Sequence, residues 1–135
     1  MRYLLDTNIC IYLIKKRPSG VLERFRESSP QDVGISTITF FELQYGVEKS
    51  QYRQRSEDAL AKFLLPLNLI DLDRFAAEEA AAIRAQLEKK GKSIGPYDLL
   101  IAGLARSRDL TLVTNNTREF ERIVGLRIEN WIDPQ

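Results

Sequence analysis

Short apolar runs with strand character alternate with longer stretches of helical periodicity along the whole of this chain. This alternation is typical of consecutive βαβ units, so we predict an α/β fold with a mainly parallel central sheet flanked by helices. The predicted strands cover residues 3–5, 33–35, 67–72, 110–114 and 126–128. The predicted helices cover residues 8–16, 20–26, 39–49, 53–65, 74–90 and 96–106. In such a sheet, functional groups gather at the carboxyl ends of the strands.

Several helix boundaries carry capping residues. Ser36 and Thr37 can cap the helix that follows them, because their hydroxyls accept hydrogen bonds from the first free N–H groups. Gly91 follows Glu88-Lys89-Lys90, where a glycine in the left-handed region commonly ends a helix. Pro96 suits the first position of the next helix.

Composition and charge narrow the class of protein. The chain has 135 residues, 44% hydrophobic and 29% charged, which predicts one folded domain over residues 1–135. Lysine and arginine number 20 against 19 aspartates and glutamates, so a net charge of +1 confines any nucleic-acid binding to a local surface. The N-terminal apolar stretch is too short for a signal peptide or a membrane span, and we therefore expect a cytoplasmic protein with no membrane partner.

The chain contains no histidine, which removes Ser-His-Asp and Cys-His nucleophilic sites, histidine acid–base catalysis and zinc sites with histidine ligands. The single cysteine, Cys10, lies within an apolar run and has no partner for an internal disulfide. We predict that it is a buried structural thiol.

Asp6 directly follows the first predicted strand, which places it at the carboxyl end of the sheet where these folds build their sites. The sequence Asp6-Thr7-Asn8 is equally typical of an ordinary turn that caps a helix, and this alternative stays open.

Glu42 falls among Ile38, Phe41 and Tyr45 when its helix is wound at about 100 degrees per residue. A carboxylate on an apolar stripe is costly to bury alone, so we expect a cation, a metal or a proton to accompany it. A salt bridge to an arginine and a metal ion are equally compatible with the pattern.

Asp98 shares one helical face with Ile101, Ala102 and Ala105. The small alanines predict close packing, which would place the carboxylate against the core. The alternative is an acid in the first turn that is merely favoured by the helix dipole.

Three acids placed against the core side of a βα fold are better explained by one shared ligand than by three separate causes. Oxygen ligands without histidine or cysteine favour Mg²⁺ or Mn²⁺ over zinc. A carboxylate-held Mg²⁺ activates water and stabilises an in-line phosphoryl displacement, so phosphodiester hydrolysis is the predicted chemistry.

A fourth polar position follows the strand at 110–114. Asn115 and Asn116 could orient water or ligate through their amide oxygens, although asparagine pairs are more often turn residues. Glu119 could complete the acidic cluster, or could lie on the surface of a short helix.

Four segments together resemble the PIN-domain ribonucleases, and more closely the VapC toxins of bacterial VapBC toxin–antitoxin pairs. Each segment is weakly specific alone, but their order and spacing over nearly the whole chain are highly specific. The segments are Leu4-Leu5-Asp6-Thr7-Asn8, Ser36-Thr37-Ile38-Thr39-Phe40-Phe41-Glu42-Leu43 with Tyr45-Gly46, Ile94-Gly95-Pro96-Tyr97-Asp98-Leu99-Leu100-Ile101-Ala102, and Val113-Thr114-Asn115-Asn116-Thr117-Arg118-Glu119-Phe120.

The resemblance implies a PIN-like three-layer sandwich and an Mg²⁺-dependent endoribonuclease, with Mn²⁺ as a possible substitute. It implies that the metal ligands are Asp6, Glu42 and Asp98. Many PIN domains carry a fourth acid after the last core strand, where this chain offers Asn116 or, one turn later, Glu119. The residues expected to orient substrate are Thr7, Asn8, Thr114, Asn115 and Asn116.

The resemblance also implies partners. A VapB antitoxin would hold the enzyme inactive by filling a groove beside the active site with its C-terminal tail, and the chain would form a homodimer. The Thr-Asn-Asn-Thr-Arg-Glu-Phe signature occurs in VapC enzymes that cleave initiator tRNA in the anticodon stem-loop, so tRNA is the expected substrate. Its cleavage would inhibit translation and growth.

Other function classes were weighed against this one. A phosphotransferase of the haloacid-dehalogenase type needs a second aspartate two residues after Asp6, where this chain has Asn8. A receiver-like signalling domain would accept phosphate on a strand-end aspartate. A catalytically silent PIN-like scaffold that binds RNA or a partner protein is the main alternative, and it requires that the three acids be satisfied by salt bridges.

Overall fold

The computed structural model describes residues 1–132 and is built around a five-stranded sheet in which all neighbouring strands run parallel. The strand order is β3-β2-β1-β4-β5, so the first strand of the chain lies at the centre. The strands are β1 (Tyr3–Leu5), β2 (Val33–Ser36), β3 (Asn68–Ile70), β4 (Thr111–Val113) and β5 (Ile128–Glu129).

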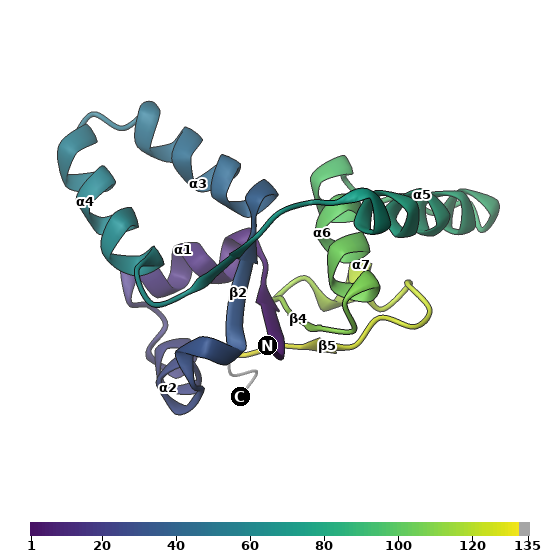
Figure 1. Cartoon of the computed structure of the whole chain (residues 1–135), viewed down its shortest axis with the longest axis horizontal. Coiled ribbons are helices and arrows are strands. Elements are labelled where there is room, and N and C mark those ends of the chain that lie inside the picture. Colours follow the sequence, from purple (N-terminus) through teal and green to yellow (C-terminus); the bar gives the residue numbers. More distant parts are fainter. Residues whose placement is uncertain (133–135) are drawn as a thin grey trace.

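Helices cover both faces of the sheet, and the predicted three-layer α/β architecture is confirmed (Figure 1). The helices are α1 (Thr7–Lys15), α2 (Ser19–Glu27), α3 (Thr37–Glu48), α4 (Arg53–Leu64), α5 (Arg74–Lys89), α6 (Pro96–Ser107) and the short α7 (Thr117–Phe120), with one 3-10 turn at Pro30–Asp32. In Figure 1, α1 to α4 lie on one side of the central strands and α5 to α7 on the other. No helix among residues 1–132 has the length and apolar character needed to cross a membrane.

The alternation of side chains along β1 divides the core into two halves. Leu4 packs on one face with buried residues of α5, α6 and α7, including Ile83 and Phe120. Leu5 packs on the opposite face with buried residues of α1 to α4, including Ile9 and Leu43. All three residues of β1 are buried, as expected for the central strand of a sheet that is covered on both faces.

The predicted caps are confirmed. The Ser36 hydroxyl accepts a hydrogen bond from the Thr39 N–H at 3.0 Å, and α3 therefore begins two residues before its predicted start. Gly91 has φ +69°, and the Lys92 N–H donates to the Leu87 carbonyl at 2.9 Å, which closes the end of α5. Cys10 is a buried free thiol, as predicted.

β2 and β4 differ from their predicted limits by one residue at one or both ends, and β3 and β5 differ more because their hydrogen bonding ends elsewhere. β3 stops at Ile70, since the Leu72 N–H donates to the Thr37 hydroxyl at 3.4 Å rather than to a strand. β5 begins at Ile128 instead of Leu126. The carbonyl of Glu129 accepts from Thr114 N–H at 2.9 Å, which sets the register on β4.

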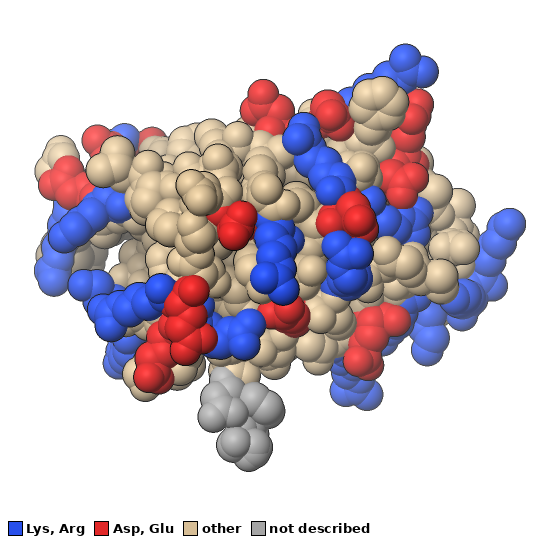
Figure 2. Space-filling view, turned by 60° about the horizontal axis from the view of Figure 1, so that its bottom comes forward, with Lys and Arg blue, Asp and Glu red and all other residues tan. Residues whose placement is uncertain are grey.

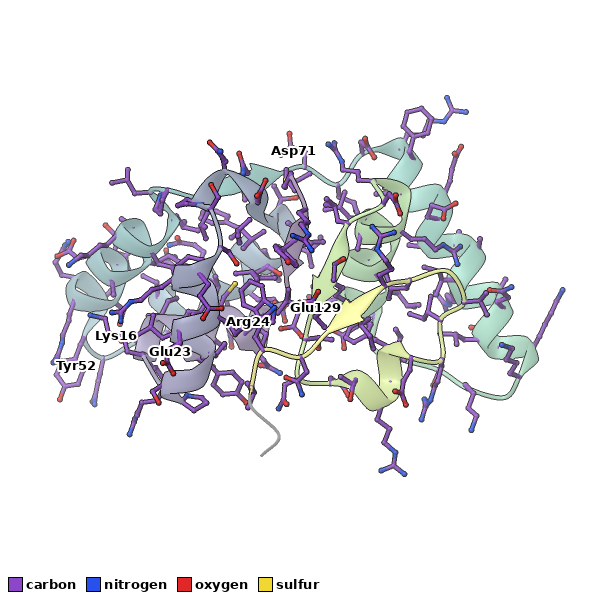
Figure 3. The ribbon with its side chains drawn as sticks, turned by 90° about the horizontal axis from the view of Figure 1, so that it is seen from below. Lys16, Glu23, Arg24, Tyr52, Asp71 and Glu129 are labelled. Atoms are coloured by element: carbon purple, nitrogen blue, oxygen red, sulfur yellow. The ribbon has the colours of Figure 1, made fainter. Side chains whose placement is uncertain are left out.

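The C-terminal strand is anchored by a polar cluster formed by Arg24, Glu129 and Trp131. Arg24 on α2 and Glu129 on β5 point toward each other in Figure 3 and are joined at 2.9 Å, and the Trp131 indole N–H donates to the same carboxylate at 3.0 Å. On the face shown in Figure 2, basic and acidic side chains are interspersed, in keeping with the small net charge.

Helices α5 and α6 approach each other at Gly103. A Cβ atom at this position would lie 2.7 Å from the Ala76 carbonyl oxygen and 2.7 Å from the Ala80 Cβ, both on α5. The glycine is therefore required by packing rather than by backbone conformation.

Replacing Gly103 by alanine should destabilise the protein by about 1–3 kcal/mol, because overpacking outweighs the better helix propensity of alanine. Gly46→Ala on α3 is the matched control, since nothing lies within 4 Å of its added methyl group, and it should be neutral or stabilising by up to about 1 kcal/mol. Urea denaturation of both variants measures the difference, and equal stabilities would contradict the close helix contact.

Candidate active site

Asp6 lies at the carboxyl end of the central strand, where its backbone N–H donates to the Val113 carbonyl of β4 at 3.0 Å. Its Oδ1 accepts a hydrogen bond from Ile9 N–H at 2.9 Å, so the predicted helix-capping role is confirmed. The side chain is only 5% exposed, and burial raises its pKa although hydrogen bonds from the Thr114 hydroxyl and the Ile9 N–H partly oppose this. Asp6 therefore caps α1 and also presents a buried carboxylate at this edge.

Glu42 lies half-buried on α3, and its Oε1 accepts a hydrogen bond from the Thr7 hydroxyl at 2.5 Å. Thr7 Oγ1 also lies 3.1 Å from Thr39 Oγ1. The predicted alternative of a salt bridge to arginine is not found among the described residues, in which Glu42 forms no ion pair. A neutral hydroxyl therefore holds this carboxylate and leaves its charge uncompensated.

The stripe around Glu42 faces the core only at Ile38, which packs against buried residues, so the prediction is wrong for Phe41 and Tyr45. Phe41 is 53% exposed and Tyr45 is 59% exposed, and α3 instead packs on the sheet through its buried residues Thr39, Leu43 and Val47. Helical periodicity identifies an apolar stripe but not what covers it. The Phe41 ring meets the Tyr97 ring of α6 edge to face at 5.7 Å, so part of this stripe forms an aromatic cluster beside the site.

Asp98 lies in the first turn of α6, and the helical face predicted for it is confirmed because Ile101, Ala102 and Ala105 are fully buried. Burial raises the pKa of Asp98 to about 6, with further contributions from the negative charges of Asp6, Glu119 and Glu42. A helix dipole acting alone would lower this pKa. Burial and the neighbouring carboxylates thus raise the pKa of Asp98 more than the helix dipole lowers it.

Glu119 is half-buried on α7 and completes the group, since its charge contributes to the raised pKa of Asp98. Its Oε1 accepts a hydrogen bond from the Asn116 side-chain amide at 3.0 Å. Asn115 points elsewhere, because its exposed side chain accepts from Asn130 at 3.3 Å. The structure therefore brings Asn116, but not Asn115, to the carboxylates.

Thr7, Asn8 and Thr114 also lie at this edge. Thr114 is fully buried and donates to Asp6, while the exposed Asn8 lines an open hollow together with Thr7 and Glu42. In the structure the two threonine hydroxyls hold carboxylates, and the predicted role of these three residues in orienting substrate stays a prediction. The signal available in the sequence was only their nearness to the acids.

The arrangement fits a hard divalent cation. Its donors are carboxylate oxygens, two of the acids have raised pKa values, and within residues 1–132 none of the four forms an ion pair with a cationic side chain. In that part of the chain no three acidic side chains stand close enough together to enclose a metal as they are placed.

A groove of about 480 Å³ leads away from this edge between α1, α3 and α4. Its floor is apolar, Lys15 and Arg55 add positive charge, and Glu42 is shared with the carboxylate site. The apolar lining includes Ile11, Ile14, Leu43, Val47 and Leu60. The resemblance implied a groove beside the site, but the sequence did not show which residues line it, because its walls come from three helices that are separate along the chain.

Comparisons with known proteins agree with this geometry. A model of the PIN domain matches residues 3–126. A tRNA(fMet)-specific endonuclease VapC of Shigella flexneri is 47% identical over 131 residues, which are 97% of this chain and 98% of that protein. Ribonuclease VapC2 of Haemophilus influenzae is 46% identical over 132 residues, 98% of this chain and 99% of that protein.

Solved structures show the same fold at similar identity. DNA-bound VapBC from Salmonella typhimurium superposes with a TM-score of 0.92 at 47% identity, over 97% of this chain and 98% of that one. VapBC2 from Rickettsia felis, bound to a DNA fragment from its promoter, gives a TM-score of 0.91 at 41% identity, over 97% of this chain and 99% of that one.

Replacing Asp98 by asparagine should stabilise the metal-free protein at neutral pH. The pKa of Asp98 is raised from 3.8 to about 6 on folding, so the folded state binds more protons than the unfolded state between these values and stability falls as pH rises through that window. The gain should be of the order of 1 kcal/mol above pH 6, allowing for solvent screening of a half-buried group, and should vanish near pH 4.

Thermal unfolding in EDTA at several pH values measures this gain. Asp71→Asn, which removes an exposed aspartate outside the carboxylate group, should change the melting temperature little. If Asp98→Asn does not raise the melting temperature at pH 7, the carboxylates do not repel one another in the folded protein.

Proposed function

This chain belongs to the PIN-domain family, among its VapC ribonucleases, and from this premise we propose that it cleaves tRNA with Mg²⁺ held by Asp6, Glu42 and Asp98. Nucleases of this kind are metal-dependent, and they act as the toxins of VapBC toxin–antitoxin pairs. The observation that carries the proposal is the group of four carboxylates at the carboxyl edge of a PIN-like sheet, none of which forms an ion pair within residues 1–132.

Some residues of the site would bind the metal, and others hold those residues in place. Asp6 follows β1 and caps α1, Asp98 lies on α6 in the other half of the fold, and Glu42 on α3 also lines the groove. When bound there, Mg²⁺ would lower the pKa of a water molecule and offset the negative charge of the phosphodiester in the transition state. Thr7 and Thr114 hold Glu42 and Asp6 by hydroxyl hydrogen bonds, which fix the carboxylates and leave them charged.

The substrate proposal rests on similarity and on the nature of RNA. Two relatives that are 47% identical over nearly the whole chain carry the name tRNA(fMet)-specific endonuclease. Sequence-specific recognition of RNA mostly targets unpaired loops, whose bases are accessible, and the anticodon stem-loop of initiator tRNA presents such a loop. We place the activity in the cytoplasm, where this substrate is found.

The groove between α1, α3 and α4 is the place we assign to the tail of a VapB antitoxin. Its apolar floor suits an apolar face of a peptide, and its continuity with Glu42 would let the peptide extend to the carboxylates. We also propose that the enzyme is a homodimer, which would cover part of the exposed apolar surface formed by Phe41, Tyr45 and Tyr97.

The cleavage proposal is tested with total tRNA, comparing wild type and Asp98→Asn in Mg²⁺ and in EDTA. Discrete fragments should appear with wild type in Mg²⁺, and Asp98→Asn should cut at least about a hundredfold more slowly, because the metal supplies several kcal/mol of transition-state stabilisation. Asp71→Asn should cleave like wild type. A folded wild-type protein that binds metal but leaves tRNA intact would exclude tRNA, and one that binds no metal would favour the silent RNA- or partner-binding scaffold.

The groove assignment predicts that Ala59→Arg, on the exposed rim of the groove, prevents neutralisation by the cognate VapB. An arginine there would occupy the space of the peptide and place a charge on an apolar contact. Growth of bacteria that express both proteins measures the effect. The matched control is Ala81→Arg, at an exposed position on α5 away from the groove, which VapB should still neutralise. Full neutralisation of Ala59→Arg would place the antitoxin elsewhere.

A further inference from the structure

Helix α7 begins without the cap that its sequence would allow. Asn116 stands at the N-cap position, where an asparagine side chain ordinarily accepts a hydrogen bond from an N–H of the first turn, yet it makes no such bond. Its side-chain nitrogen instead donates to Oε1 of Glu119, the third residue of the helix, at 3.0 Å. The Asn116 side chain therefore orients the carboxylate of Glu119 and does not cap the helix.

The backbone N–H of Asn116 also lacks its usual capping partner. In a capping box the acid at the third position accepts from the backbone N–H of the N-cap residue. Here the Asn116 N–H donates to Oγ1 of Thr114 at 2.9 Å. Thr114 is fully buried, and its hydroxyl donates in turn to Asp6. A continuous set of hydrogen bonds thus joins the carboxylate of Asp6 to that of Glu119 through Thr114 and Asn116.

An amide suits this position for an electrostatic reason. The Asn116 side chain can fix Glu119 by donating a hydrogen bond and adds no charge of its own. A lysine or arginine would fix the carboxylate equally well but would cancel the negative charge that draws a cation. The neighbouring Asn115 cannot serve in the same way, since it is exposed and bonded to Asn130.

We propose that Asn116 is a positioning residue that holds Glu119 toward the metal site, so that Glu119 supplies the fourth carboxylate and Asn116 is not itself a ligand. Asn116 thereby affects metal binding only through Glu119. The inference rests on the proposed metal site of Asp6, Glu42 and Asp98, and its test separates the two proposals.

The test is the affinity of the full chain, free of RNA, for Mn²⁺, measured by electron paramagnetic resonance. Asn116→Asp keeps the shape and an oxygen that could ligate, but it replaces the donor to Glu119 by a repelling carboxylate. It should weaken Mn²⁺ binding about tenfold, as loss of a supporting hydrogen bond commonly does. Asn116→Ala, which only removes the donor, should weaken binding in the same direction.

The same substitutions in a Glu119→Gln background complete a double-mutant cycle. If Asn116 acts only through Glu119, Asn116→Ala should cause no further loss of Mn²⁺ affinity once the carboxylate is gone. A merely structural role would weaken binding equally in both backgrounds. Melting temperatures of all variants verify that each one is folded, and Asn115→Asp adds the same charge one residue away and should change the affinity less than about twofold.

Each other result has a defined meaning. Mn²⁺ binding by Asn116→Asp that equals or exceeds that of wild type would overturn the inference and make residue 116 a ligand position. An Asn116→Ala effect that persists at full size in the Glu119→Gln background would also overturn it. Absence of Mn²⁺ binding by folded wild type would overturn the proposed metal site itself, and with it the reason for positioning Glu119.

Discussion

The burial of one carboxylate at the end of the central strand is the constraint on which the rest of the site depends. Asp6 directly follows β1, with β2 on one side of that strand and β4 on the other, and its side chain is almost inaccessible to solvent. A charge in that place is unfavourable unless hydrogen bonds or a counter-ion accompany it. The Ile9 N–H and the Thr114 hydroxyl supply the hydrogen bonds, and the neighbouring acids make a bound cation the natural counter-ion.

Neutral donors, rather than cationic side chains, hold these carboxylates. Thr7 bonds Glu42, Thr114 bonds Asp6, and Asn116 bonds Glu119. Each such bond contributes about 1 kcal/mol and leaves the negative charge in place, whereas an arginine would stabilise the site by neutralising it. The chain carries 20 lysines and arginines, yet among residues 1–132 their ion pairs lie elsewhere on the surface. The negative charge that the proposed metal site needs is thus kept at a cost in stability.

Helix α3 connects catalysis to control in the proposed scheme. Its buried side packs on the sheet through Leu43 and Val47, which also line the groove, while Glu42 belongs to both the groove and the carboxylate group. A peptide seated in the groove would therefore contact the same helix that carries Glu42, a ligand of the proposed metal site. The exposed aromatic side of α3, with Phe41 and Tyr45, remains available for a second protein surface.

The sequence by itself determined the elements, their parallel arrangement and the placement of Asp6 after the first strand and of Asp98 on a buried helical face, because strand and helix periodicity and the position after a strand are local properties. Periodicity misjudged the surroundings of Glu42, since an apolar stripe has the same spacing whether it faces the core or solvent. The limits of β3 and β5 depended on hydrogen bonds to Thr37 and to β4, which the local pattern does not contain. The bond from Asn116 to Glu119 is local, but the capping preference of asparagine predicts a different partner for that side chain. Only the tertiary structure decided that three helices enclose a groove ending at Glu42, because its walls are far apart along the chain.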